Sequence, residues 1–203
     1  MNSLEIIPIN FQRLVLGSLG LIGGFWLLTA FSWAWWALLI GGGLAWLVVF
    51  QRTTWSAFRR PHRLWTIPLG AIGYLLLSLA VGLLAKQLGF NWSANPESGH
   101  LTILIFKLPL MLMGEELLGI GILEVARNQG RSLLFSTLIS ALIFGLMHAV
   151  VYWDGDLVST FVHVIVLQGM ARLIFNGIYL ATGKSLWGSW SCHLLVDLVA
   201  LSL

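Results

Sequence analysis

Long apolar runs follow one another along this chain and are separated only by short polar connections. Inside a bilayer, backbone N–H and C=O groups must be paired within the protein, and a helix of about 20 apolar residues does this while it crosses the hydrocarbon core. Hydrophobic residues make up 58% of the chain and charged residues only 9%, whereas charged residues are about a quarter of a soluble domain. The sequence therefore predicts an all-α, polytopic bundle of transmembrane helices.

Seven runs are long enough to be spans, and an eighth helix is predicted if the Gln51–Trp65 segment folds as a short helix. Trp55, Phe58 and Trp65 stand among arginines there, a pattern typical of an amphipathic segment at the membrane surface. No room is left for a separate soluble domain, so residues 1–203 are predicted to form one integral membrane domain. The N-terminal stretch has no basic n-region, so we expect no removable signal peptide. The predicted spans are 12–31, 33–50, 66–86, 101–125, 132–152, 158–181 and 186–203.

The basic residues lie mainly in alternate connections between the predicted spans. Connections rich in Lys and Arg face the cytoplasm, so this placement predicts a cytoplasmic N-terminus in a multi-pass protein of the cytoplasmic membrane. Lys86 is then the one cation in an outer connection. The cations are too few for a nucleic-acid surface, and the lipid bilayer is the expected surrounding partner. The predicted inner connections carry Arg13, Arg52, Arg59, Arg60, Arg63, Arg127, Arg131 and Lys184.

An acid pair, Glu115-Glu116, interrupts the apolar run 101–125. An acid at the centre of a spanning helix costs about 2.5–3.5 kcal/mol on insertion scales, so this pair requires partners, water or a chemical role. Two later runs carry polar signatures whose members are four residues apart and therefore share a helix face: Phe144 with His148, and His193 with Asp197. Three interruptions on three spans predict one shared polar centre.

The short connection at residues 127–131 predicts that the fourth and fifth spans are antiparallel neighbours. Pairing residues equidistant from its centre sets Glu115 beside residue 143, so His148 lies about 7 Å further along the axis. The two side chains meet only if the helices tilt or one of them is irregular. Glu115 and Glu116 also point about 100° apart, so the second acid needs a partner of its own.

The sixth predicted span carries a polar stripe that is expected to face the interior of the bundle, Gln168, Arg172 and Asn176. Arg172 and Lys107 are the cations that lie well inside predicted spans, away from the span ends. A buried cation in a membrane pairs with an acid or with backbone carbonyls. We therefore expect Arg172 to have a carboxylate partner, for which the candidates are Glu115, Glu116 and Asp197.

Two kinds of chemistry use a carboxylate with two imidazoles and an aspartate. In hydrolysis, a carboxylate takes a proton from water, an imidazole positions that water, and a second donor stabilises the oxyanion. In a metal site, Glu and His are ordinary zinc ligands. The residues alone do not choose between metal-free hydrolysis and zinc, and core histidines with hydrogen-bonding roles are the structural alternative. An ion or solute transporter is a further alternative, although the sequence shows no internal repeat.

In order, identity and separation these motifs resemble those of the CPBP family, the CAAX prenyl protease type II and bacteriocin-processing membrane proteases, also called the Abi family. That family carries EExxxR, then FxxxH, then HxxxN or HxxxD, on successive transmembrane helices. Here Glu115-Glu116, Phe144 to His148 and His193 to Asp197 match, and the likeness covers roughly residues 103–203. The resemblance implies an intramembrane endopeptidase of the glutamic type that uses no metal or other cofactor.

The resemblance also implies a role for each residue. Glu115, the first acid of the pair, activates water together with His148, while His193 and Asp197 stabilise the oxyanion. An ionised Asp197 only accepts hydrogen bonds, so it is expected to orient His193 or to act in its protonated form. The expected substrate is a membrane-associated peptide or protein, cleaved near the membrane surface at a CAAX-type C-terminus, a leader peptide or a membrane anchor. We expect the cavity of such an enzyme to open to the cytosolic leaflet.

The chain departs from the family motif at residue 120, where Ile120 stands in place of the arginine of EExxxR. Glu116 then lacks its local counter-charge, so we expect it either to be protonated or to pair with another cation of the bundle, and Arg172 is the best candidate. The loss of the motif arginine also favours an alternative hypothesis, in which the chain is a catalytically silent family member that acts as a membrane scaffold, a regulator or a bacteriocin-immunity protein.

Overall fold

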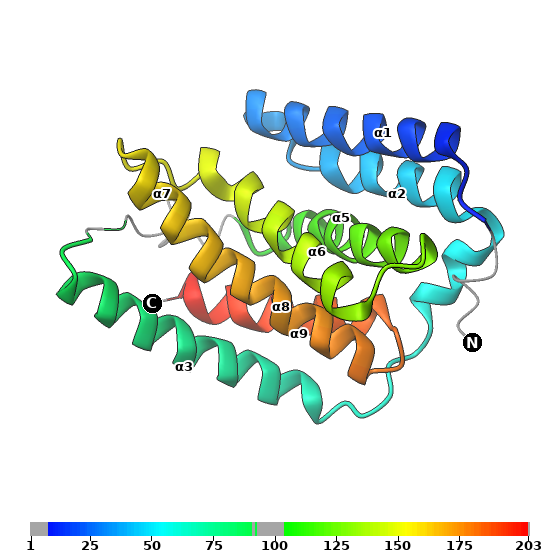
Figure 1. The fold of residues 1–203 in the computed structure, drawn as a ribbon. Coiled ribbons are helices and arrows are strands. Elements are labelled where there is room, and N and C mark those ends of the chain that lie inside the picture. The colour runs from blue at the N-terminus through cyan, green and yellow to red at the C-terminus, as the bar shows by residue number, and fades with distance from the viewer. Residues whose placement is uncertain (1–7, 91, 93–103, 203) are drawn as a thin grey trace.

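The computed structural model describes residues 8–90, 92 and 104–202. Within these residues the regular structure is helical and contains no strand, which confirms the predicted all-α fold (Figure 1). A π-helical segment, Val164–Gly169, joins α7 to α8, so the described chain has seven helices when these two are counted as one. The helices are α1 (Phe11–Ala30), α2 (Ala37–Phe50), α3 (Thr66–Gln87), α5 (Leu108–Asn128), α6 (Leu133–Met147), α7 (Leu157–His163), α8 (Met170–Ala181) and α9 (Leu186–Ala200).

Five helical segments of the described residues are long and apolar enough to cross a membrane, as expected of a multi-pass integral membrane protein. They are Phe11–Ala30, Ala37–Phe58, Thr66–Gln87, Leu133–Val150 and Leu157–Ala181. The predicted spans 101–125 and 186–203 correspond to α5 and α9, which fall outside this set. α5 carries Glu115, Glu116, Glu124 and Arg127, and α9 is only 15 residues long.

α5 and α9 run through the interior of the bundle, where neighbouring helices shield their polar residues from lipid. α2 packs against α5, and α3 packs against α9 from the other side (Figure 1). Gly114, directly before the acid pair, lies against α2 so closely that a Cβ there would be 2.7 Å from the backbone N of Leu39. This close approach seals one side of α5 next to the acids.

The π-helical segment changes the face of the helix that follows it. A π turn adds a residue to the turn and so rotates the side chains beyond it relative to those before it. Arg172 and Asn176 are fully buried in α8, but Gln168 lies in the π segment and is only half-buried. The predicted inward stripe is therefore confirmed for Arg172 and Asn176, whereas Gln168 is only partly buried.

One end of the bundle, here called the arginine-rich end, collects the connections that carry most of the cations. The backbone N–H of Ile9 donates to Asn128 Oδ1, and Ser185 Oγ donates to the carbonyl oxygen of Arg59. The apolar cluster at this end joins side chains of α2, α5, α8 and α9. The arginine-rich end carries the eight cations that were predicted to lie in inner connections: Arg13, Arg52, Arg59, Arg60, Arg63, Arg127, Arg131 and Lys184.

Lys107 lies outside the helix in which the sequence placed it. The helix that was predicted to begin at residue 101 has its continuous α-helical part from Leu108, and Lys107 is its N-cap residue. The Lys107 ammonium lies 5.9 Å from the centre of the Trp35 ring, in the connection between α1 and α2. Lys107 and Lys86, in the last turn of α3, therefore lie at the end of the bundle opposite the arginine-rich end.

The predicted short helix after α2 is present as a 3-10 helix, Gln51–Phe58. It ends earlier than the predicted segment, which reached Trp65. Thr54 and Ala57 are buried while Trp55 is 69% exposed, so the segment has one face on the protein and one facing outward. This agrees with an amphipathic surface segment.

Candidate active site

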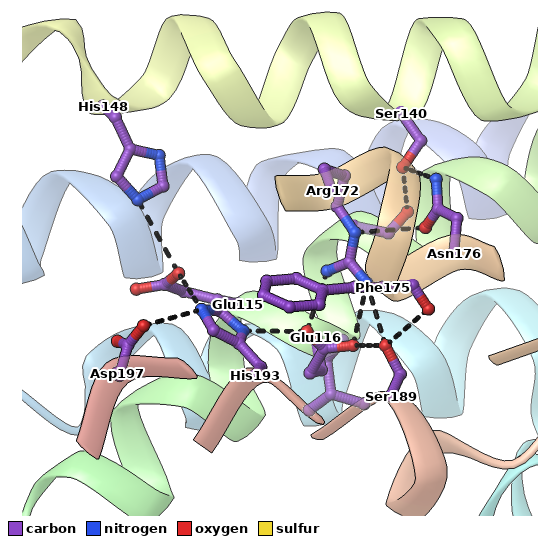
Figure 2. Close-up of polar contacts among 12 residues, drawn as sticks. Glu115, Glu116, Ser140, His148, Arg172, Phe175, Asn176, Ser189, His193 and Asp197 are labelled. Carbon is purple, nitrogen blue, oxygen red and sulfur yellow. Dashed lines mark hydrogen bonds and ion pairs between the residues drawn. The ribbon is translucent and has the colours of Figure 1, made fainter. Parts of the chain in front are cut away.

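Glu116 is completely buried, and both of its carboxylate oxygens are occupied (Figure 2). Arg172 donates from Nη1 to Oε1 and from Nη2 to Oε2, each over 2.9 Å. Ser189 Oγ donates to Oε2, and His193 Nδ1 lies 2.9 Å from Oε1. A carboxylate with this many donors is held in its ionised form in one orientation. Glu116 therefore organises the site and has no oxygen left for another proton.

A chain of buried hydrogen bonds fixes the Arg172 guanidinium from its other side. Arg172 Nε donates to Asn176 Oδ1 over 3.1 Å, and Asn176 Nδ2 donates to Ser140 Oγ over 3.2 Å. Ser140 Oγ donates in turn to the carbonyl oxygen of Gly119 over 2.8 Å. This network connects α5, α6, α8 and α9, and all of its side chains are fully buried.

The counter-charge that the motif lacks at residue 120 comes from α8. Ile120 is fully buried in the apolar cluster of the arginine-rich end, and the expected ion pair between Arg172 and Glu116 is confirmed at 2.9 Å. Gly119 makes room for it, since a Cβ at that position would lie 2.6 Å from Arg172 Nη1. An arginine from another helix, α8, thus supplies a counter-charge to the acid pair.

Glu115 points away from this network and toward the two histidines. Its Oε2 lies 3.7 Å from His148 Nε2 and 3.9 Å from His193 Nε2. Asp197 Oδ1 lies 3.8 Å from the same His193 nitrogen. The predicted shared centre therefore exists as an arrangement of Glu115, His148, His193 and Asp197 (Figure 2). The catalytic roles assigned to these residues remain predictions.

His148 reaches Glu115 because α6 stops one residue before it. α6 ends at Met147, and His148 begins a 3-10 turn that ends at Val150. The sequence placed His148 about 7 Å beyond Glu115 along the helix axis, so that the two could meet only if the helices tilted or one of them was irregular. The 3-10 turn at the end of α6 is such an irregularity. His148 Nδ1 lies 2.8 Å from the carbonyl oxygen of Phe144. Since a carbonyl oxygen only accepts, Nδ1 carries the proton. When the ring is neutral, the Nε2 lone pair then faces Glu115.

Two phenylalanines hold the imidazole rings. The Phe144 ring lies 4.7 Å from the His148 ring and 6.1 Å from the His193 ring, centre to centre. Phe175 stacks on His193 at 4.3 Å, and the Arg172 guanidinium lies 5.2 Å from the centre of the Phe144 ring. The predicted supporting residues Phe144 and Arg172 therefore contact the centre directly, and the sequence analysis missed Phe175.

Ser189 was also missed, although the sequence contains a signal for it. Ser189, His193 and Asp197 are spaced four residues apart and lie on one face of α9. Extending the His193 to Asp197 stripe by one turn toward the N-terminus would have found the serine. Phe175 has no comparable signal, because phenylalanine is ordinary in an apolar helix.

Some of the side chains that could bind zinc are engaged in other contacts, whereas Glu115 and the Nε2 atoms of His148 and His193 make no direct hydrogen bond to one another. Both oxygens of Glu116 and Nδ1 of His193 are hydrogen-bonded. Within the described residues, no group of three His, Cys, Asp or Glu side chains is arranged to hold a metal ion. The donor set that the zinc alternative requires is therefore not preformed in this part of the chain.

Comparison with known proteins identifies the family. A family model described as type II CAAX prenyl endopeptidase Rce1-like matches residues 97–199, about half of the chain. No curated protein and no solved structure gives a match. The matched region contains the acid pair, both histidines, Asp197 and Arg172. The chain therefore belongs to the Rce1-like family of CPBP, or type II CAAX prenyl endopeptidase, membrane proteins.

Proposed function

We propose that this protein is an intramembrane endopeptidase of the glutamic type, with Glu115 as the general base. The observation that carries the proposal is the different environment of the two adjacent acids. Glu116 is saturated by Arg172, Ser189 and His193. Glu115 keeps its carboxylate beside two imidazole nitrogens and partly exposed, with 16% of its side chain accessible.

The distances around Glu115 suit an intervening water. Separations of 3.7 and 3.9 Å are too long for a direct hydrogen bond. A water molecule bridges polar groups over such separations. Bound there, it donates one proton to Glu115 and the other to the free Nε2 of His148. Both of its protons are then fixed, and a lone pair on its oxygen faces the substrate.

Hydrolysis follows from proton transfer to Glu115. As Glu115 removes the first proton, the water oxygen bonds to the carbonyl carbon of the scissile peptide and a tetrahedral oxyanion forms. Glu115 then returns that proton to the amide nitrogen, the C–N bond breaks, and an amine and a carboxylic acid are released. No group outside the protein, the water and the peptide takes part.

His193 is the proposed donor to the oxyanion. Ionised Glu116 on Nδ1 favours the imidazolium form, in which Nε2–H is free to donate. Asp197 lies 3.8 Å from Nε2 and adds a negative charge that stabilises this form. Asp197 is therefore proposed as a positioning residue for His193, since an ionised carboxylate cannot donate to the oxyanion.

The alternative of a catalytically silent member rested on the missing motif arginine. Arg172 supplies a bidentate counter-charge to Glu116. This supports an active centre.

The test is hydrolysis by the purified protein in lipid nanodiscs, screened against a library of membrane-anchored peptides with mass-spectrometric detection. Glu115→Gln keeps the shape of the side chain but removes the base, and we expect a loss of at least about a hundredfold in rate. Asp154→Asn, an acid in a loop outside the centre, is the matched control. Equal hydrolysis by the native protein and Glu115→Gln would exclude the proposed base.

A further inference from the structure

The candidate centre does not lie midway along the bundle. Glu115 lies about 10 Å from the first residue of α5 and about 20 Å from the last, by helical rise. His148 follows the last residue of α6, and Asp197 is three residues from the end of α9. The first residue of α5 and the last residues of α6 and α9 all lie opposite the arginine-rich end. The centre is therefore displaced away from that end.

The exposure of the polar side chains follows the same direction. On the side of the arginine-rich end, Arg172, Asn176 and Ser189 are fully buried and hydrogen-bonded to one another or to Glu116. On the other side, 16% of the His148 side chain and 27% of the Asp197 side chain are accessible. The fully buried polar side chains of the centre therefore lie toward the arginine-rich end, and the accessible side chains lie toward the opposite end.

A second buried layer closes the route from the arginine-rich end further. Glu124, which is 1% exposed, accepts a hydrogen bond from the Tyr179 hydroxyl over 3.0 Å. Lys184 Nζ lies 3.2 Å from Glu124 Oε1. These contacts lie between Arg172 and the connections of that end, where they tie α5 to the connection between α8 and α9.

The distribution of charge indicates which end faces the cytoplasm. Eight of the eleven Lys and Arg residues of the chain lie at the arginine-rich end, Arg172 lies in the buried network, and Lys86 and Lys107 lie at the other end. Asp154 and Asp156 precede α7 at that other end. Short connections rich in Lys and Arg remain in the cytoplasm. This bias orients the arginine-rich end inward.

We propose that the candidate centre opens to the non-cytoplasmic side of the membrane, and not to the cytosolic leaflet as expected from the sequence, and that its substrate is a peptide segment of a translocated chain in the outer half of the bilayer. The identity of the substrate rests on the proposed protease function, whereas the orientation does not. A prenylated CAAX C-terminus is made in the cytosol and anchors on the cytoplasmic surface. A leader peptide or membrane anchor of an exported protein presents its scissile bond on the side to which this centre opens.

The orientation is tested by cysteine labelling, which requires no activity. Cys192 is the only cysteine of the chain and is fully buried, so the native protein provides the unlabelled background. The same substitution is available at both ends: Ser132→Cys in the exposed α5–α6 connection and Ser202→Cys in the exposed turn after α9. Val150 lies two residues after His148 and is 67% exposed, so Val150→Cys reports on the accessibility of the centre from the end opposite the arginine-rich end.

In intact cells, a membrane-impermeant maleimide is expected to label Ser202→Cys and Val150→Cys at least tenfold faster than Ser132→Cys. Permeabilisation is expected to make Ser132→Cys reactive. Faster labelling of Ser132→Cys in intact cells, or equal labelling of Ser132→Cys and Ser202→Cys, would overturn the proposed orientation. If labelling follows the proposal but Glu115→Gln does not affect hydrolysis, the orientation stands and the protease function fails.

The substrate class is tested with one cleavable segment in two reporters. The segment that the peptide screen identifies is fused either to an exported protein or to a cytosolic protein with a prenylated C-terminus, and both are expressed with the native protein or with Glu115→Gln. We expect cleavage of the exported reporter to depend on Glu115. Cleavage of the prenylated cytosolic reporter alone would contradict the proposed substrate class.

Discussion

Arg172 and Glu116 form a fully buried, bidentate ion pair between α8 and α5, with both nitrogen–oxygen distances at 2.9 Å. The two residues are 56 positions apart in the chain, so this pair fixes the interior helix α5 against α8. It also occupies both carboxylate oxygens of Glu116, the second acid of the motif, and leaves Glu115, the first acid, outside the ion pair. The same contact thus stabilises the bundle and separates the roles of two adjacent carboxylates.

Replacing Arg172 is expected to destabilise the protein strongly. Arg172→Ala leaves the Glu116 carboxylate buried without its main counter-charge, which costs about 3–5 kcal/mol in buried pairs of this kind. Arg172→Lys keeps the charge but not the two-pronged geometry, so we expect an intermediate loss. Unfolding in detergent micelles measures both, with the exposed Arg60→Ala as control. An Arg172→Ala protein as stable and active as the native one would show that the ion pair has no such role.

The two acids of the motif are expected to differ in their effect on stability. Glu116→Gln leaves the buried charge of Arg172 without its counter-charge and should lower the free energy of unfolding by about 3–5 kcal/mol. Glu115→Gln removes a partly exposed carboxylate that makes no direct hydrogen bond, so its stability should stay within about 1 kcal/mol of the native value. Unfolding curves of the two variants, recorded side by side, decide this. Equal destabilisation by both substitutions would contradict the division between an organising acid and a catalytic one.

Hydropathy was enough to predict the helices, because in lipid the backbone has few alternatives to a helix. It did not reveal that α5 and α9 are interior helices, since that depends on which neighbours cover them. The acid pair gave the clearest local signal, and the need for a counter-charge led directly to Arg172. A solitary charge inside a membrane protein constrains its partner more strongly than an apolar residue does.

The details of the centre depend on irregular backbone that the sequence does not mark. The 3-10 turn at His148 and the π-helical segment Val164–Gly169 set which side chains face Glu115 and Glu116. Both segments consist of residues that also suit a regular helix. α6 and the π-helical segment are packed closely together, since a Cβ at Gly145 would lie 2.8 Å from the carbonyl oxygen of Val164. Only the assembled bundle contains this contact.

Chelators are expected to leave hydrolysis unchanged. In the proposed mechanism Glu115 and His148 activate water without a metal, and Glu116 and His193 Nδ1 are hydrogen-bonded to each other. The measurement is the initial rate after treatment of the purified protein with EDTA or phenanthroline, together with metal analysis of the same sample. Stoichiometric zinc whose removal abolishes activity and whose return restores it would replace the proposed mechanism with a metal-dependent one.

The loop before α7 is expected to be stabilised by an ionised aspartate down to low pH. Hydrogen bonds from Ser159, the backbone N–H of Asp156 and Thr160 hold the pKa of Asp154 below its usual value. A lowered pKa in the folded protein means that this contribution is present above the ordinary aspartate pKa and is lost as the pH falls through the lowered value. The protection factors of the amides in the first turn of α7, corrected for the intrinsic exchange rate at each pH, should therefore fall only at acidic pH. Asp154→Asn should remove this pH dependence, and an unchanged profile would contradict it.

Gly119→Ala tests whether the position of Arg172, rather than its charge alone, maintains the centre. The added methyl group would lie 2.6 Å from Nη1 and 2.7 Å from Cδ of Arg172, so the guanidinium must move away from α5. Overpacking of this kind costs about 1–3 kcal/mol, and we also expect hydrolysis to fall because His193 loses its fixed Glu116 partner. Gly177→Ala in α8 is the matched control, since a Cβ there has no neighbour within 4 Å. If the two alanine variants have the same stability and rate, the packing of Arg172 against Gly119 does not matter. If only Gly119→Ala is impaired, the close approach of the guanidinium to α5 is what allows an arginine from α8 to serve the acid pair.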